Sequence, residues 1–332
     1  MSVKSYAKVG AAFGVAALGL GILAAPASAD PTSATDYRQL AGVGSDTTQD
    51  VMNGLGDVIT NANGKVIASW DATGTTPITT KVNCSIARPN GSSAGITALN
   101  NDINAGTGCI DFARSSRGPA DTSTNDLTFI PYAKDGVTYA TDLGSTVPTN
   151  LTKTQLASIY TNCTYTDASG NVITVAPLLP QTGSGTRTFW LSAIGLTDSQ
   201  VGSCVTQGVQ EHNGEAITAA NQLMPYSIAQ WIAQGKGITG VDNRRGESRL
   251  RSINSLAPTT GSGTALALNL NFDAGFLRNV YNVVPTGKLS NAVIADTFVG
   301  AASKVCSNSA TITNYGFGAL TDCGATTLTG ER

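Results

Sequence analysis

Small polar residues gather in three turns of this sequence, at points where a strand is expected to lead into a helix. The turns are residues 42–48 (GVGSDTT), 90–95 (NGSSAG) and 182–187 (TGSGTR). Ser and Thr just ahead of an apolar run are N-cap residues, and Gly lets the backbone approach a ligand closely. The first N–H groups of a helix lack internal partners and lie at the positive end of the helix dipole. Each turn is therefore a potential anion-binding site.

Strands and helices alternate along the chain, which predicts an α/β fold with mixed sheets. In open sheets of this class, ligands bind beyond the carboxyl ends of the strands, where such turns meet. A fourth turn, residues 114–118, adds hydroxyls and two arginines, and arginine forms charge-assisted hydrogen bonds with oxyanions. The candidate ligand-binding residues in the four turns are Ser45, Asp46, Thr47, Ser92, Ser93, Ser116, Arg117, Ser184, Gly185, Thr186 and Arg187.

The first 29 residues have the pattern of a secretory signal peptide. A short basic start precedes an apolar run, and Ala27-Ser28-Ala29 is a cleavage motif with no Cys after it, so no lipid anchor is expected. Removing Lys4 and Lys8 lowers the 20 basic residues to 18 against 22 acidic ones, a net charge of about −4. This balance disfavours nucleic-acid binding, which requires a basic face. The mature protein is expected to be secreted or in the periplasm or cell envelope.

The six cysteines predict disulfides, because exported chains with an even number of cysteines usually oxidise them. No C-x-x-C pair occurs and His212 is the only histidine, so neither a metal site nor a cofactor is expected. Six cysteines allow 15 pairings. Pairing between sequence neighbours is favoured here, which gives Cys84–Cys109, Cys163–Cys204 and Cys306–Cys323.

The hydrophobic pattern predicts several further elements. Residues 49–62 and 216–234 have helical spacing, and residues 65–70 read as a strand. Residues 127–132 and 136–141 are expected to be two strands near a crossing between lobes. His212 is expected to have a structural role and the three tryptophans to lie in the core, while Arg244 and Arg245 are expected in a solvated loop.

The order of the polar turns resembles that of the phosphate-binding proteins of ABC uptake systems. That family has a first Gly-rich motif, then G-S-S/G-x-G, D-F-x-x-S and G-S-G-T. The corresponding segments here are GVGSDT, GSSAG (91–95), DFARSS (111–116) and GSGTR (183–187), in the same order. The resemblance covers most of residues 40–260. It implies a two-lobed, type II periplasmic-binding-protein-like fold, with mixed sheets flanked by helices, a hinge between the lobes and the ligand in the interlobe cleft.

The sequence departs from the family at three places. Ser116 stands where the family has an aspartate that accepts the proton of hydrogen phosphate, and Pro180 stands where it has an arginine. Asp46 and Thr47 align with a Thr and an aromatic residue. Without the aspartate, discrimination against sulfate is expected to be poorer than in the family. Arginines placed to replace the lost charge are Arg88, Arg114, Arg117 and Arg187, of which Arg117 and Arg187 are the preferred candidates.

The resemblance implies an exported, monomeric binding protein for phosphate or a related oxyanion, with an ABC permease as partner. No nucleophile–base arrangement typical of enzymes is found, so the protein is not expected to be an enzyme. The alternative is a secreted surface or interaction protein that keeps the fold without a transport role. The expected organisation is a tail at 30–37, one lobe from residues 38–134 plus 259–332, and a second lobe from residues 135–258.

Overall fold

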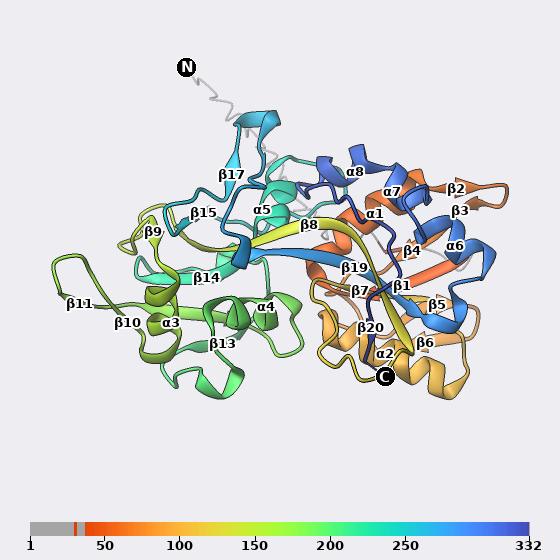
Figure 1. The fold of residues 1–332 in the computed structure, drawn as a ribbon, viewed down its shortest axis with the longest axis horizontal. Helices are drawn as coiled ribbons and strands as arrows, with labels where there is room; N and C mark the ends of the chain where they lie inside the picture. Colours follow the sequence, from red (N-terminus) through yellow and green to blue (C-terminus); the bar gives the residue numbers. More distant parts are fainter. Residues whose placement is uncertain (1–29, 32–36, 332) are drawn as a thin grey trace, which may run out of the picture.

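Two long antiparallel strands, β8 (Leu127–Asp142) and β19 (Leu277–Pro285), run side by side between two lobes (Figure 1). The computed structural model describes residues 30–31 and 37–331, so the predicted signal peptide lies outside the described residues. β8 is one continuous strand where the sequence predicted two. Almost every residue of β8 is buried, because the strand passes through the middle of the molecule instead of along a surface.

The first lobe is built on a parallel sheet in the order β4-β1-β7, which continues through antiparallel β19. Its core includes Val51, Met52 and Leu55, the buried face of the helix predicted from residue 49. Its elements are β1 (Leu40–Gly44), η1 (Asp46–Thr48), α1 (Gln49–Val58), β2 (Thr60–Asn61), β3 (Gly64–Lys65), β4 (Ile67–Ser69), β5 (Ile78–Lys81), β6 (Cys84–Ile86), α2 (Ser92–Ala105), β7 (Phe112–Ser115), η6 (Thr286–Lys288), α6 (Ala292–Phe298), α7 (Lys304–Ser307), α8 (Ser309–Asn314) and β20 (Thr329–Gly330).

The second lobe has the strand order β13-β12-β14 and joins β8 through antiparallel β14. Its core is a separate cluster in which Trp190 packs against Tyr160 and Phe276. The remaining elements are β9 (Asn150–Leu151), α3 (Lys153–Asn162), β10 (Thr164–Thr166), β11 (Val172–Thr174), β12 (Ala176–Pro180), α4 (Gly185–Ile194), η2 (Asp198–Gln200), β13 (Thr206–Val209), η3 (Gly214–Ala216), β14 (Gln222–Ser227), α5 (Ile228–Gly235), β15 (Ser248–Leu250), β16 (Ser252–Ile253), β17 (Thr259–Thr260), η4 (Gly263–Ala265), β18 (Ala267–Leu268) and η5 (Ala274–Phe276).

The helix predicted for residues 216–234 is wrong in its first half. Residues Gln222–Ser227 form β14, and the helix α5 begins only at Ile228. Ser227 caps α5 by accepting a hydrogen bond from the backbone N–H of Gln230 at 3.1 Å. Leu223, Met224 and Tyr226 therefore lie in a buried strand, whose short apolar run is hard to tell from a helix by periodicity alone.

The main strands of both lobes belong to one connected ten-stranded sheet, and five further pairs of short strands form separate two-stranded sheets. The turns before α2 and α4 come from different lobes. Ser93 donates its backbone N–H to the carbonyl of Gly183 at 3.1 Å, which joins the turn before α2 to the turn before α4. These two turns are therefore in contact, as the sequence predicts. No helix within residues 30–31 and 37–331 is long and apolar enough to cross a membrane.

The three predicted disulfides are present, and the described part of the chain contains no free cysteine. Cys84–Cys109 joins β6 to the segment before β7, and Cys163–Cys204 joins the end of α3 to the loop before β13. Cys306–Cys323 joins α7 to the C-terminal loop. Each disulfide stays within one lobe, so none of them restricts movement of the lobes relative to each other.

Candidate anion site between the lobes

Three helix starts meet where the lobes touch. Thr47, in η1, lies with its Oγ1 3.2 Å from Oγ1 of Thr186, in the first turn of α4. Ser92, the first residue of α2, packs against Gly185, the first residue of α4. All of these residues are buried. The interface is thus lined with hydroxyls and with helix N-termini, groups that bind anions.

Two glycines make this close approach possible. A Cβ at Gly91, which has φ 104°, would collide with the backbone of Gly183 in the other lobe. A Cβ at Gly185 would collide with the Oγ atoms of Ser92 and Ser116. Ser184, the N-cap of α4, accepts a hydrogen bond from the N–H of Arg187 at 3.1 Å, as predicted for this turn.

The buried cation at the centre is Arg278, which the sequence analysis missed. Its Nη2 donates to Oγ1 of Thr186 at 3.0 Å, with a longer contact of 3.4 Å to Oγ1 of Thr47. Its Nε and Nη2 also donate to Oδ2 of Asp135 at 3.0 and 2.9 Å. Its Nη1 is buried and has no hydrogen-bond partner among the described residues. Arg278 therefore touches both lobes and keeps one donor unused.

The predicted arginines are held by other partners. Arg117 forms a two-pronged ion pair with Glu331 at 2.8 and 2.9 Å, and its Nη2 donates to Ser93 Oγ. Arg187 pairs with Asp198 at 2.6 Å and donates to the carbonyl of Pro180. Arg88 pairs with Asp30, and Arg114 is buried against backbone carbonyls of the first turn and Ser69.

The serine hydroxyls differ in how they are engaged. Ser92 Oγ lies 3.2 Å from Ser116 Oγ and accepts the backbone N–H of Ser116 at 3.0 Å, so two predicted residues meet. Ser184 Oγ donates to Oε2 of Glu211 at 2.7 Å. Ser45 Oγ is buried without a hydrogen-bond partner among the residues described. Buried polar atoms are normally satisfied, so Ser45 is a candidate for contact with a ligand.

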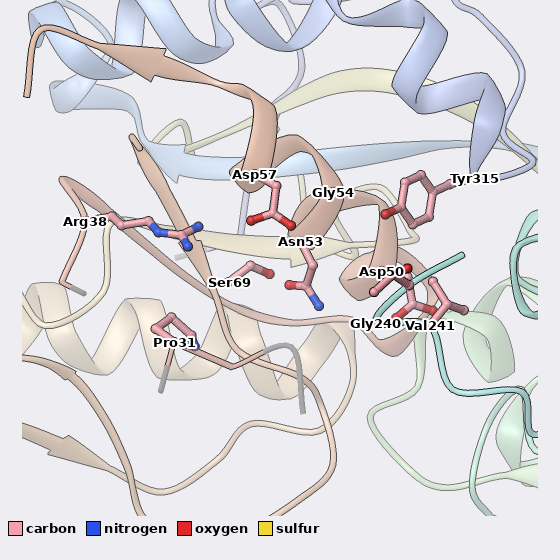
Figure 2. Close-up of a pocket in the computed structure, with 11 residues that line it drawn as sticks. Pro31, Arg38, Asp50, Asn53, Gly54, Asp57, Ser69, Gly240, Val241 and Tyr315 are labelled. Carbon is pink, nitrogen blue, oxygen red and sulfur yellow. The ribbon is translucent and has the colours of Figure 1, made fainter. Parts of the chain in front are cut away.

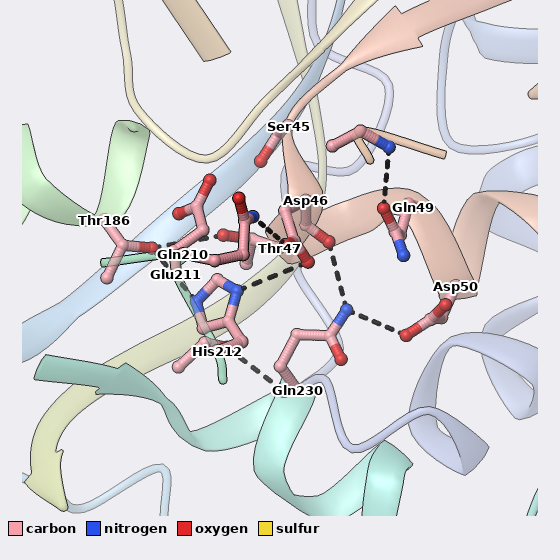
Figure 3. Close-up of polar contacts among 12 residues, drawn as sticks. Ser45, Asp46, Thr47, Gln49, Asp50, Thr186, Gln210, Glu211, His212 and Gln230 are labelled. Carbon is pink, nitrogen blue, oxygen red and sulfur yellow. Dashed lines mark hydrogen bonds and ion pairs between the residues drawn. The ribbon is translucent and has the colours of Figure 1, made fainter. Parts of the chain in front are cut away.

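Asp46 holds the lobes together (Figure 3). Its carboxylate accepts Nε2 of Gln210 at 2.7 Å and Nη2 of Arg244 at 3.1 Å, and lies 3.6 Å from Nδ1 of His212. Gln230 Nε2, from α5, donates to the Asp46 carbonyl at 3.0 Å. We refer to Asp46, Gln210, His212 and Arg244 as the interlobe latch. Burial alone would raise the pKa of Asp46, but Arg244 and His212 outweigh it and hold the pKa well below its usual range.

The expectation that Arg244 lies in a solvated loop is wrong. Its side chain is 15% exposed and pairs with buried Asp46, which no local sequence pattern reveals because the partners are 198 residues apart. Arg245 instead stacks over Trp231 at 4.5 Å. His212 is buried, with Nε2 3.2 Å from Thr186 Oγ1 and its ring packed on Tyr226.

Asp50 lies beside the latch, in the first turn of α1, and also lines a pocket of about 180 Å³ with Asn53, Ser69 and Tyr315 (Figure 2). Its Oδ2 accepts Nε2 of Gln230 at 3.0 Å. Burial raises the pKa of Asp50 to about 7. An acid whose pKa is raised on folding stabilises the protein fully below its unfolded pKa, and this stability is lost as the pH rises through the folded value.

Replacing Asp50 with Asn should therefore remove a pH-dependent loss of stability. We expect the wild-type free energy of unfolding to fall as the pH rises from about 4 to about 7. Asp50→Asn keeps an acceptor for Gln230 and should be the more stable protein at pH 8. Urea unfolding at several pH values tests this. A difference between the two proteins that is independent of pH would contradict it.

The comparisons with known proteins agree with the fold of this chain. The family model described as a PBP superfamily domain matches residues 29–288. Comparison with curated proteins finds no match. Among solved structures, the chain is similar to an ABC-type phosphate transport receptor from Vibrio cholerae, at 20% identity and a TM-score of 0.53, covering 85% of this chain and 100% of that one.

Two other solved structures have comparable similarity. One is a putative phosphate ABC transporter substrate-binding protein with bound phosphate from Clostridium perfringens, at 15% identity and a TM-score of 0.54, covering 85% of this chain and 99% of that one. The other is a phosphate-binding protein from Stenotrophomonas maltophilia, at 14% identity and a TM-score of 0.52, covering 87% and 92%. At these identities the likeness concerns the fold, and it confirms the predicted two-lobed α/β architecture. Since the family model covers most of the chain, the protein belongs to the PBP superfamily domain family.

Proposed function

We propose that this protein is an exported solute-binding protein that holds phosphate or a related tetrahedral oxyanion between its lobes for ABC-type uptake. The observation that carries the proposal is Arg278, a buried guanidinium with an unused Nη1 where the starts of η1 and α4 meet. Cleavage after Ala29, a monomeric state and an ABC permease as partner are parts of the same proposal. The lobes are proposed to comprise residues 38–134 plus 259–332 and residues 135–258, with Leu268, Phe272 and Phe276 of the first range packed into the core of the second lobe.

The energetics require the arginine. A helix N-terminus contributes about 0.3–1 kcal/mol to a bound anion, and up to about 2 kcal/mol when partly buried. Micromolar affinity requires about 8 kcal/mol. Hydrogen bonds to charged groups add about 1.5–3 kcal/mol each. Helix starts and serine hydroxyls alone therefore fall short, and Arg278 takes the place of the arginine that Pro180 replaces.

A second candidate is a secreted surface or interaction protein without a transport role. The interlobe latch favours it, because Asp46 stands where the family has a hydroxyl residue and forms a buried ion pair with Arg244 across the lobes. A buried pair of this kind holds the lobes together without any ligand. A protein with such a latch could display a fixed surface in place of opening and closing around a solute.

Calorimetry with phosphate on the mature protein separates the two functions. The transport function predicts saturable binding that Ser184→Ala weakens about tenfold, because the variant loses the hydroxyl that caps α4 and donates to Glu211. Ser303→Ala is the matched control, since Ser303 caps α7 by accepting the N–H of Cys306. No heat with phosphate, arsenate or sulfate would favour the second function. Equal affinities in both variants and the wild type would show that α4 does not contact the anion.

A further inference from the structure

One face of α1 lines the pocket of about 180 Å³ beside the interlobe latch (Figure 2). Asp50, Asn53 and Asp57 are spaced at i, i+3 and i+7, so they share this face, while Val51 packs in the core of the first lobe. Val241, in the loop after α5, lines the pocket from the second lobe. Asp57 is exposed, whereas Asp50 is 4% exposed. The pocket therefore leads from the surface to a buried carboxylate.

The walls of this pocket carry hydrogen-bond acceptors that lack donors. Asp50 accepts one hydrogen bond from the described residues, from Nε2 of Gln230 to Oδ2 at 3.0 Å. Asn53 Nδ2 donates to Asp71 at 2.8 Å, but its Oδ1 is buried with no hydrogen-bond partner in the described part of the chain. Figure 2 shows the Tyr315 hydroxyl directed into the pocket. Since buried polar atoms are normally satisfied, an occupant that donates hydrogen bonds would fit these walls.

The charges around the pocket favour a cation. Asp50 forms no ion pair with any described residue, and a buried carboxylate is costly without a counter-ion. Asp57 is paired with Lys65 at 2.7 Å on the exposed side. Arg38 also lines the pocket, but its Nη1 donates to the backbone carbonyls of Gly56 and Ile67 at 3.1 and 2.6 Å. The buried end of the pocket therefore carries an uncompensated negative group.

We propose that this pocket binds a small organic ammonium ion, with the charged nitrogen at Asp50 and a short carbon chain against Val241 and the ring of Tyr315. A primary ammonium group carries three N–H donors and a positive charge, which match the acceptors and the carboxylate. A cavity of about 150 Å³ holds benzene, so this pocket has room for about six non-hydrogen atoms. The site is separate from the proposed anion site and does not depend on the proposed function.

A metal ion fits the pocket less well than an ammonium ion. Calcium takes about six to eight oxygen ligands, several of them carboxylates. Among residues 30–31 and 37–331, no group of three or more His, Cys, Asp or Glu side chains could hold a metal ion. The apolar wall formed by Val241 would also be of no use to a bare ion, whereas it can cover the carbon chain of an amine.

Binding of the ammonium ion should depend on pH through Asp50. Burial raises the pKa of Asp50 to about 7, against the opposing effects of the hydrogen bond from Gln230 and the charge of Arg244. The titratable groups that face Asp50 are Asp46, Asp71, Arg244 and Tyr315. Only the ionised carboxylate attracts a cation, and an alkylammonium keeps its proton up to about pH 10. Affinity should therefore rise about tenfold between pH 6 and pH 8.

Calorimetry with n-butylammonium chloride at pH 8 and constant ionic strength tests the site on the mature wild type, Asp50→Asn and Asp296→Asn. We expect saturable binding of one equivalent to the wild type, weakened at least about tenfold in Asp50→Asn by the loss of a charge-assisted hydrogen bond. Asp296→Asn removes the same charge from an exposed pair with Lys304, so it should bind like the wild type. Circular dichroism checks that both variants are folded.

Tetramethylammonium is the matched control ligand, because it has the same charge and number of non-hydrogen atoms but no N–H donor. It should bind at least about tenfold more weakly than n-butylammonium. Equal binding of the two ions, or equal affinity of Asp50→Asn and the wild type for n-butylammonium, would overturn the proposal. Calcium binding without n-butylammonium binding would also overturn it, as would the absence of both heat and a rise in melting temperature with every cation. None of these results bears on phosphate binding, so the proposed function is tested separately.

Discussion

Arg278→Met should weaken phosphate binding by at least about 100-fold, because it removes the buried charge at the centre of the site. The loss of one or two charge-assisted hydrogen bonds, at about 1.5–3 kcal/mol each, corresponds to a factor of this size. Arg278→Lys should retain part of the affinity, since an ammonium keeps the charge but cannot serve Asp135 and a ligand with the same planar geometry. Calorimetry with phosphate measures all three proteins.

Arg278→Met also leaves Asp135 buried without its ion-pair partner, which by itself destabilises a fold by about 3–5 kcal/mol. The double variant Arg278→Met/Asp135→Asn removes both charges and separates stability from binding. We expect it to fold well and still fail to bind phosphate. Arg249→Met, at a side chain that is 40% exposed, is the control for a lost arginine. If the double variant binds phosphate with an affinity within threefold of the wild type, Arg278 does not contact the anion.

Asp46→Ala should have the largest effect on stability, about 3–5 kcal/mol at pH 7, because it leaves Arg244 without its buried partner. Asp57→Ala is the matched control, since its pair with Lys65 is exposed and should contribute less than about 1 kcal/mol. Urea unfolding measures both. A double variant Asp46→Ala/Arg244→Met should recover part of the loss. Equal stabilities of the Asp46→Ala and Asp57→Ala proteins would contradict the latch.

The latch also predicts a response to acid. Burial raises the pKa of Asp46, but Arg244 and His212 lower it further, so its folded pKa lies below the unfolded value of about 3.9. An acid with a depressed folded pKa stabilises the protein above its unfolded pKa, and the stability is lost as the pH falls through the folded value. Wild type should therefore lose this stability below about pH 4, while Asp46→Ala shows no such component.

The sequence predicts the turns and helix starts of the site because short, local sequence motifs specify them. The Ser184 cap and Gly185 are adjacent, and the turn that contains them meets a second turn of the same kind across the lobes. The cysteine pairs are neighbours in sequence, which is why their pairing could also be predicted.

The charged groups of the site could not be placed in this way. Arg278 lies in a buried strand, LRNVYNVVP, and its only local signal is a cation within an apolar run. Arg244 and Glu211 lie in polar loops that look solvated, but Arg244 pairs with Asp46 of the other lobe and Glu211 is fully buried against the cap of α4. Arg117 and Arg187 were preferred for their position in the turns, but local position does not reveal that Glu331 and Asp198 already hold them.

A crystal structure of the mature protein with phosphate tests the central claim most directly. The account predicts phosphate between the lobes, within hydrogen-bond distance of Arg278 Nη1, Ser45 Oγ and the first backbone N–H groups of α4. Phosphate bound only outside the cleft, with Arg278 Nη1 and Ser45 Oγ contacting no anion, would contradict it.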